Sequence, residues 1–501
     1  MPLIGGCVVG PNYHRPSLPP AEKYSPAPLP PATSSAAGIG AGAAQSLDPA
    51  SVISTQWWTL FRSPALNRLI DQAFAANPTI DAAVAALKEA QEEVYAQRGY
   101  FYPTVQVSYQ GERSKLSGNT ASSAAPGPQG NGENISPLAP AQPVTYNFHT
   151  AQLTVGYVPD VFGLNRRQVE SLQAQADAAR YQLQAAYLTL ASNVVAAALQ
   201  EAATRAQIAA VQSIIRSNVR SLRILHSQLR LGYATRLDVA QQQLALAQAR
   251  VLLPPLARQL AQSRDLIRAL AGRAPDHDVP ETFTLDALHL PARLPLSLPS
   301  QLIEQRPDVL AAEAQVRSAS AQVGVAVANR LPQFSLDAAL GGQATRIQQM
   351  FWSSGTFWSV LGSASQPVFD AGSLRHRQNA AEQALAQAAA QYRSTVITAL
   401  QNVADSLHAL YTDADALRSA VAVERAAQVT LAVSRRQFQA GYANGLAVLA
   451  AQQAYQQAVI ARVQAQAARL GDTAALFQAL GGGWWNAGGA KSKSFQRSAE
   501  P

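Results

Sequence analysis

The feature that most constrains this chain is an uninterrupted helical pattern that begins at Leu164 and ends at Leu231. The stretch contains neither glycine nor proline. Its apolar residues recur at steps of three and four: Leu172, Ala176, Ala179, Leu183, Tyr187, Leu190 and Val194. Their mean spacing of about 3.67 residues per turn is typical of a long, nearly straight helix. At a rise of about 1.5 Å per residue this is a rod of roughly 100 Å, longer than an ordinary globular core needs.

The rod has a second copy further along the chain. The same apolar pattern returns about 209 residues later as Ala381, Leu385, Ala388, Tyr392, Val396, Ala399 and Val403. Gly232-Tyr233-Ala234-Thr235 ends the first rod, and Gly441-Tyr442-Ala443-Asn444 ends the second. A turn between two antiparallel helices favours a residue that tolerates a positive φ, so this conformation is predicted for Gly232 and Gly441.

Before each rod the period changes from helical to alternating. Val105, Val107 and Tyr109 alternate with polar residues after Tyr102-Pro103, and Phe334, Leu336, Ala338 and Leu340 do so after Leu331-Pro332. Each pattern predicts a strand with one apolar and one polar face. In the partner strand at about 146–157, Tyr146 and Phe148 have the opposite parity to Leu153, Val155 and Tyr157. That change of parity predicts a β-bulge.

The chain is therefore predicted to be internally duplicated, mainly α with a small β part. Residues 64–272 form the first repeat and 299–482 the second, joined by a proline-rich connector at 273–298. Each repeat holds a β-hairpin, at about 103–157 and 332–367, and a long antiparallel helix pair, at about 164–271 and 373–480. Pro254-Pro255 should break the return helix of the first pair. Residues 7–63 are expected to be an extended tether, and 483–501 a flexible tail.

The hairpins give the sequence its membrane interpretation. No run of 18 apolar residues exists, so a transmembrane helix is excluded. Strands of about ten residues with one apolar face have the span of tilted membrane strands. Membrane barrels start at about eight strands, so four strands require oligomerisation, and a trimer supplies about twelve. The polar face would line a wet lumen: Thr104, Gln106, Ser108, Gln110, Ser335 and Asp337. The alternative is a water-soluble sheet that caps a coiled-coil scaffold.

Composition argues against catalysis and nucleic-acid binding. The formal charge is +8, but the arginines are spread singly along helices. The seven histidines are isolated, and Asp276-His277-Asp278 lies in the proline-rich connector, where a solvated loop is favoured over a metal site. No glycine-rich phosphate loop is present. We expect no enzyme activity, no cofactor and no metal.

The single cysteine, Cys7, follows small residues and is the remaining candidate for chemistry. Its context is that of a bacterial lipoprotein signal, in which the cysteine is lipidated. Only six residues precede it, so residues 1–6 are interpreted as the residual end of such a signal. The alternative is a free thiol.

Motifs distributed over about residues 7–485 carry a family resemblance. They are Cys7-Val8-Val9-Gly10-Pro11-Asn12-Tyr13, Trp57-Trp58, Leu298-Pro299-Ser300, Arg306-Pro307-Asp308-Val309, Ala312-Glu313, Leu331-Pro332 and the two Gly-Tyr-Ala turns. Together they resemble the TolC/OprM/NodT-type outer-membrane efflux lipoproteins. The resemblance implies a homotrimer in which a twelve-stranded transmembrane β-barrel in the cell outer membrane continues into a helical periplasmic tunnel, an α-barrel. It also implies a lipid anchor such as palmitate at Cys7, a periplasmic adaptor (membrane fusion) protein and an inner-membrane pump, often of the RND type.

The resemblance also implies roles for the helix turns. Gly232, Tyr233, Gly441 and Tyr442 would be adaptor-docking tips. Relatives narrow the periplasmic end with side chains after the second turn, often acidic ones, but this chain has Ala447 and Ala450 there. Leu446 and Leu449 are therefore candidates for an apolar gate, with helix packing as the alternative. Asp238 is a further gate candidate, although a helix N-terminal charge is the favoured interpretation.

The expected function is passive conduction of drugs or toxic compounds from an inner-membrane pump to the exterior, as in multidrug resistance. One alternative is the exit duct of a type I protein secretion system. Another, less favoured, is a soluble periplasmic coiled-coil scaffold.

Overall fold

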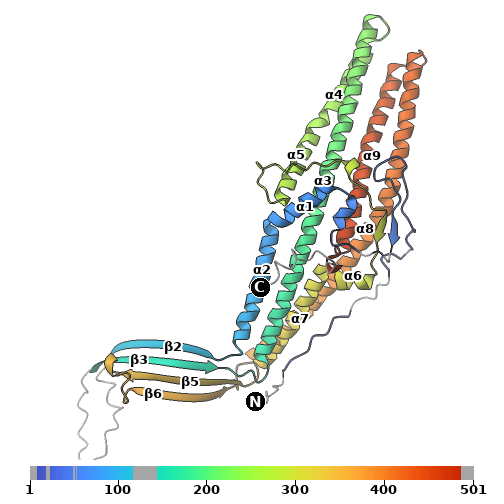
Figure 1. Cartoon of the computed structure of the whole chain (residues 1–501). Coiled ribbons are helices and arrows are strands. Elements are labelled where there is room, and N and C mark those ends of the chain that lie inside the picture. Colours follow the sequence, from blue (N-terminus) through green and yellow to red (C-terminus); the bar gives the residue numbers. More distant parts are fainter. Residues whose placement is uncertain are drawn as a thin grey trace, which may run out of the picture. The chain divides into compact units, whose positions relative to one another are not determined.

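A computed structural model describes residues 8–17, 23–26, 28–48, 51, 53–116 and 144–486 (Figure 1). Cys7 lies outside the described residues, as do most of the long first hairpin loop and the tail beyond residue 486. The chain divides into two compact units. One contains residues 1–14, 90–174 and 317–387, and the other contains the remainder.

The first unit is built on one four-stranded antiparallel sheet (Figure 1). Its strands are β2 (Thr104–Leu116), β3 (Val144–Tyr157), β5 (Gln333–Ala344) and β6 (Thr356–Ser365), in the spatial order β2-β3-β5-β6. Each repeat contributes one hairpin, and the β3–β5 pairing joins the two repeats. The sheet therefore has two unpaired edges in the single chain, β2 and β6.

The pairing of β2 with β3 contains no bulge, so that prediction is wrong. The register runs unbroken from Thr104 opposite Gly156 to Leu116 opposite Val144. Directly opposite residues share a face of the sheet, which places Phe148 with Glu112. The change of parity in β3 thus reflects aromatic residues on the otherwise polar face. It does not reflect an inserted residue, because every residue of the strand keeps its ladder partner.

Long helices dominate the chain (Figure 1). The two rods, α3 (Leu164–Arg230) and α8 (Ser373–Gln439), have 67 residues each, as the apolar pattern predicted. The return helices are α4 (Arg236–Val251) with α5 (Leu253–Leu270), and α9 (Gly445–Ala479). The first is interrupted at Leu252, two residues before Pro254, as expected from the missing N–H groups of Pro254-Pro255. Within the described residues, no helix is long and apolar enough to cross a membrane.

The shorter helices begin with proline in both repeats. They are α1 (Pro64–Ala76), α2 (Pro78–Gly99), α6 (Pro299–Gln305) and α7 (Pro307–Ala328). Short elements complete the second unit: the parallel pair β1 (Ser46–Asp48) and β4 (Arg293–Pro295), and 3₁₀ turns at Trp57–Phe61, Leu285–Ala287 and Trp484–Asn486. A further 3₁₀ turn at Ile347–Gln349 lies in the second hairpin.

Small side chains and a few aromatic rings form the core of the helical unit. Ala191, Ala198 and Ala202 on α3 are fully buried, which lets neighbouring helices approach closely. Trp57 is buried and stacks on Phe477 of α9, with ring centroids 5.4 Å apart. Such stacked rings contribute about 0.5–1.5 kcal/mol beyond their buried area.

The Arg306-Pro307-Asp308 motif has a structural role in this unit. The buried Arg306 guanidinium donates to both carboxylate oxygens of Asp308, at 3.0 and 2.7 Å. It also donates to the carbonyl oxygen of Ala479 at 2.6 Å, one of the last carbonyls of α9. The motif thus stabilises the start of α7 and the end of α9 through one side chain.

Candidate functional site

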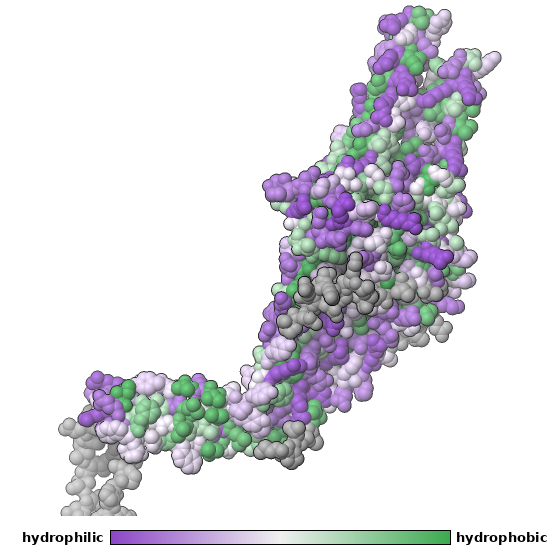
Figure 2. All heavy atoms as spheres, in the orientation of Figure 1, coloured by the Kyte–Doolittle hydropathy of each residue, from purple (hydrophilic) through white to green (hydrophobic). Residues whose placement is uncertain are grey.

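One face of the sheet is apolar across all four strands. Val107, Leu153, Leu340 and Trp358 lie directly opposite one another in a row, and Val105, Val155, Ala338 and Val360 form the next row. These side chains are not buried in the single chain: Val107 is 77% exposed and Trp358 is 76% exposed. Figure 2 shows hydrophobic residues gathered over the strands. A continuous exposed apolar face of this kind marks an interaction or membrane surface.

The opposite face carries the polar residues. Gln106, Thr154, Ala339 and Ser359 form one row across the four strands. Asp337 lies in the row of Thr104, and Ser335 donates to its carboxylate at 2.9 Å. The predicted separation of apolar and polar positions is therefore confirmed for β2 and β5. The rows of β6 were not identified from the sequence, although Trp358, Val360 and Gly362 alternate with Ser359 and Leu361.

The two helix turns have the same backbone construction. Gly232 and Gly441 both have φ of +79°, which confirms the prediction that these positions need glycine. After α3, the N–H of Tyr233 donates to the carbonyl of Gln228 at 2.8 Å, and that of Gly232 donates to Leu229 at 3.1 Å. An equivalent pair of hydrogen bonds follows α8. This is the Schellman arrangement, which satisfies carbonyls that the helix end leaves unpaired.

The turns differ at the helix that follows. Thr235 caps α4 and forms a capping box, in which Asp238 Oδ2 accepts from the Thr235 N–H at 2.8 Å. At the second turn Asn444 caps α9 by accepting from the Ala447 N–H at 3.0 Å. Ala447 cannot return a bond, because it has no polar side chain. Asp238 therefore has a structural role as a capping residue at the start of α4. This agrees with the helix N-terminal charge that the sequence favoured.

The turn side chains are exposed. Tyr233 and Tyr442 are 81% and 87% exposed, and no atom lies within 4 Å of a Cβ built on either glycine. Leu446 is 53% exposed in the single chain, whereas Leu449 is half-buried. The structure thus leaves Leu446 free for contact beyond its own chain, while Leu449 already contributes to packing.

A buried amide cluster joins the two helix pairs below the turns. Gln242 of α4 donates to Asn218 Oδ1 of α3 at 3.2 Å, and Gln452 of α9 donates to the same oxygen. Asn218, Gln242 and Gln452 are each at most 5% exposed. Because buried amides without partners cost free energy, this cluster favours one alignment of α9 against the first pair.

A second buried polar cluster lies where the tether covers α9. Arg469 is fully buried and donates to Thr33 Oγ1 at 3.0 Å and to the Ala43 carbonyl at 2.7 Å. Nearby, burial and a hydrogen bond with Asp472 raise the pKa of Asp413 to about 7. Two carboxyl groups in contact away from water hold one proton between them more readily than two separate charges.

The chain belongs to the outer membrane efflux protein family, whose model matches residues 69–273 and 298–482. The pyoverdine export outer membrane protein OpmQ of Pseudomonas putida is 29% identical over 430 residues, which cover 86% of this chain and 88% of that protein. The probable efflux pump outer membrane protein TtgC of Pseudomonas putida is 26% identical, covering 96% of this chain and 94% of that protein. Among solved structures, the outer-membrane channel OprN superposes with a TM-score of 0.82 at 27% identity, covering 95% of this chain and all of that one.

The family defines the class of protein as an outer-membrane component of efflux systems. An outer-membrane location with a periplasmic helical part follows from this family and from the superposition on a solved outer-membrane channel. Membership argues against the soluble scaffold that the sequence left open.

Proposed function

We propose that three copies of this chain form the outer-membrane channel of a tripartite efflux pump and passively conduct small toxic molecules to the exterior. The observation that carries this proposal is the exposed apolar face, which runs through all four strands of a family member. In a closed twelve-stranded barrel this face would contact lipid and the polar rows would line the lumen. Pairing β6 of one copy with β2 of the next would remove both unpaired edges.

The exposed turns are proposed to dock a periplasmic adaptor protein that links the channel to an inner-membrane pump of the RND type. Gly232, Tyr233, Gly441 and Tyr442 form these tips. Arg230 and Arg236 flank the first turn, and Arg435 and Arg436 precede the second. Because this charge is predominantly positive, the adaptor surface should be acidic, and its binding should weaken as salt rises.

The periplasmic constriction is proposed to be apolar. Leu446 lies in the first turn of α9, where an apolar ring would exclude water from a narrow pore. The amide cluster around Asn218 would hold α9 in place, with Leu449 as a packing residue. Asp238 is engaged in its capping box, which makes it a weaker gate candidate.

The lipid anchor is proposed at Cys7, with the described segment that follows it held in place. The buried Arg167 guanidinium donates to the carbonyls of Val9 and Gly10 at 3.0 and 3.2 Å. Gly10 has φ of +91°, and a Cβ there would lie 2.4 Å from Gly324 Cα, so the segment fits only with glycine. The described segment at Val9 and Gly10 is thus held on the protein by Arg167.

The relatives suggest the class of cargo. Their names assign pyoverdine export to OpmQ and an efflux pump to TtgC. Deletion of the gene should sensitise its host to small organic toxicants, and complementation should require a matching pump and adaptor. Unchanged susceptibility together with loss of a secreted protein would instead favour type I secretion.

A further inference from the structure

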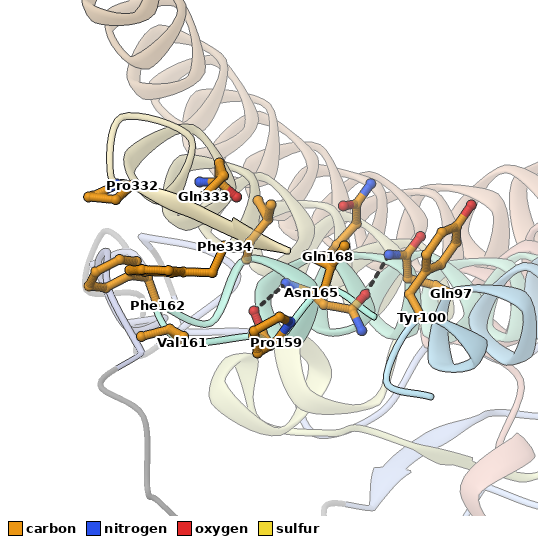
Figure 3. Close-up of a pocket in the computed structure, with 13 residues that line it drawn as sticks. Gln97, Tyr100, Pro159, Val161, Phe162, Asn165, Gln168, Pro332, Gln333 and Phe334 are labelled. Carbon is orange, nitrogen blue, oxygen red and sulfur yellow. Dashed lines mark hydrogen bonds between the residues drawn. The ribbon is translucent and has the colours of Figure 1, made fainter. Parts of the chain in front are cut away.

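One cavity in the sheet-containing unit has no role in the account above. It lies where the strands give way to helices, has a volume of about 280 Å³ and is shown in Figure 3. This is just below the range of about 300–1,000 Å³ that is usual for small-molecule sites. The space therefore suits one slender chain and not a bulky ligand.

The lining changes from apolar to polar along the cavity. The phenyl rings of Phe162 and Phe334 lie at one end, with centroids 6.3 Å apart, and Val161 lies beside them (Figure 3). Gln97, Asn165 and Gln168 of the helices supply amide groups toward the other end. An amphipathic ligand is favoured by such a gradient over a wholly apolar or wholly charged one.

A hydrogen bond within the wall orders the amide part of the cavity. Asn165 Oδ1 accepts from Gln97 Nε2 at 2.6 Å, which fixes the orientation of the Asn165 amide. Its Nδ2 is buried and has no hydrogen-bond partner among the described residues. This nitrogen also has no accessible area on the cavity wall, so a ligand in the cavity does not contact it.

The apolar part continues the exposed face of the sheet. Phe334 precedes Leu336 and Leu340 at even steps along β5, so all three lie on the apolar face. Val158 directly follows β3 and is 57% exposed. The cavity is thus lined by residues next to the central strands β3 and β5, together with the end of α2.

We propose that this cavity binds one acyl chain of a membrane phospholipid, with the chain against Phe162 and Phe334 and its ester end toward the amides of Gln97 and Gln168. The continuity of the cavity wall with the apolar face identifies the lipid as the ligand, and this rests on the membrane placement of the sheet proposed above. The helix-side amides then meet the ester region of the bilayer, and the strand-side rings meet its hydrocarbon.

The test is photo-crosslinking of the full-length protein in liposomes that contain phosphatidylethanolamine with a diazirine in its acyl chain. Labelled peptides should include residues 158–168 and 332–334. Val161→Trp fills the cavity and should lower labelling there about tenfold, whereas the matched Val107→Trp on the open face should not.

Four results would overturn the assignment. Labelling of the apolar strand rows without any at the cavity would refute the acyl-chain site alone, whereas unlabelled strands would refute the membrane placement itself. Cavity labelling that is equal in Val161→Trp and the unmodified chain would show nonspecific contact. Labelling that appears only in Cys7→Ser would mean that the chain attached to Cys7 fills the cavity in place of a free phospholipid.

Discussion

The two helix turns share one backbone solution but use different side chains to begin the returning helix. Both end a 67-residue helix with a glycine at φ of +79° and the same pair of hydrogen bonds. The first then has Thr235 and Asp238 in a capping box, whereas the second has Asn444 and an alanine at position 447. Helix entry therefore does not require an acid at the second turn. The absence of that acid leaves the exposed, apolar Leu446 in the first turn of α9 to narrow a pore.

The largest effect is expected from replacing Leu446, the exposed apolar residue after the second turn, with a polar residue. Leu446→Ser should raise ion conductance of the channel in planar bilayers by about tenfold, the factor given by a barrier lowered by about 1.4 kcal/mol. The matched control is Leu237→Ser, since Leu237 holds the same position after the first turn and is also exposed, at 65%. Equal currents for both variants and the unmodified channel would remove Leu446 from the gate.

Because both turns need glycine, replacing either one should lower the stability of the protein by a similar amount. Gly232→Ala and Gly441→Ala should each destabilise the protein by about 1–2 kcal/mol, because only the left-handed backbone opposes the methyl group. Gly471→Ala is the control: it lies within α9 with open space around it and should stabilise the helix by about 1 kcal/mol. Denaturant midpoints check the values, and a clear difference between the two turn variants would contradict their equivalence.

Exchanging the acid between the turns should produce effects of opposite sign. Asp238→Ala should destabilise the protein by about 0.5–1 kcal/mol, through loss of the capping box and of a favourable helix N-terminal charge. Ala447→Asp should stabilise it by about 0.3–1 kcal/mol, because the same interactions become available to α9. Thermal unfolding of the two variants measures this, and destabilisation by Ala447→Asp would show that position 447 opposes negative charge.

A pH-dependent effect is expected at a site remote from the turns. The pKa of Asp413 is raised to about 7 in the folded protein, so the folded state retains a proton that the unfolded chain has released. The stability from this group is present below about pH 4 and is lost as pH rises toward 7. Asp413→Asn should flatten that part of the stability profile in thermal melts at pH 5 and pH 8. An unchanged pH dependence would mean that the pair with Asp472 does not share a proton.

The sequence predicted the helices and turns well because their signals are local. A 67-residue helical pattern without glycine or proline is compatible with few structures other than one long helix. Gly232 and Gly441 are required by the backbone conformation of the turn itself. The Pro254-Pro255 break follows from the missing N–H groups in the same way.

The features that were missed depend on partners distant in sequence. The supposed bulge in β3 could be rejected only from the continuous register with β2. The rows through Trp358 and Val360, the amides around Asn218 and the unpaired Asn165 Nδ2 arise where separate elements meet. Contacts between separate elements cannot be predicted from a local sequence period. The capping role of Asp238 could be predicted, because Thr235 lies only three residues away.

The most direct test of the account is a cryo-EM structure of the purified full-length protein in lipid nanodiscs. We predict three copies, with β6 of each paired to β2 of the next, and with Val107, Leu153, Leu340 and Trp358 facing lipid. A single copy with open sheet edges, or a barrel whose Gln106 and Thr154 row faces lipid, would contradict it.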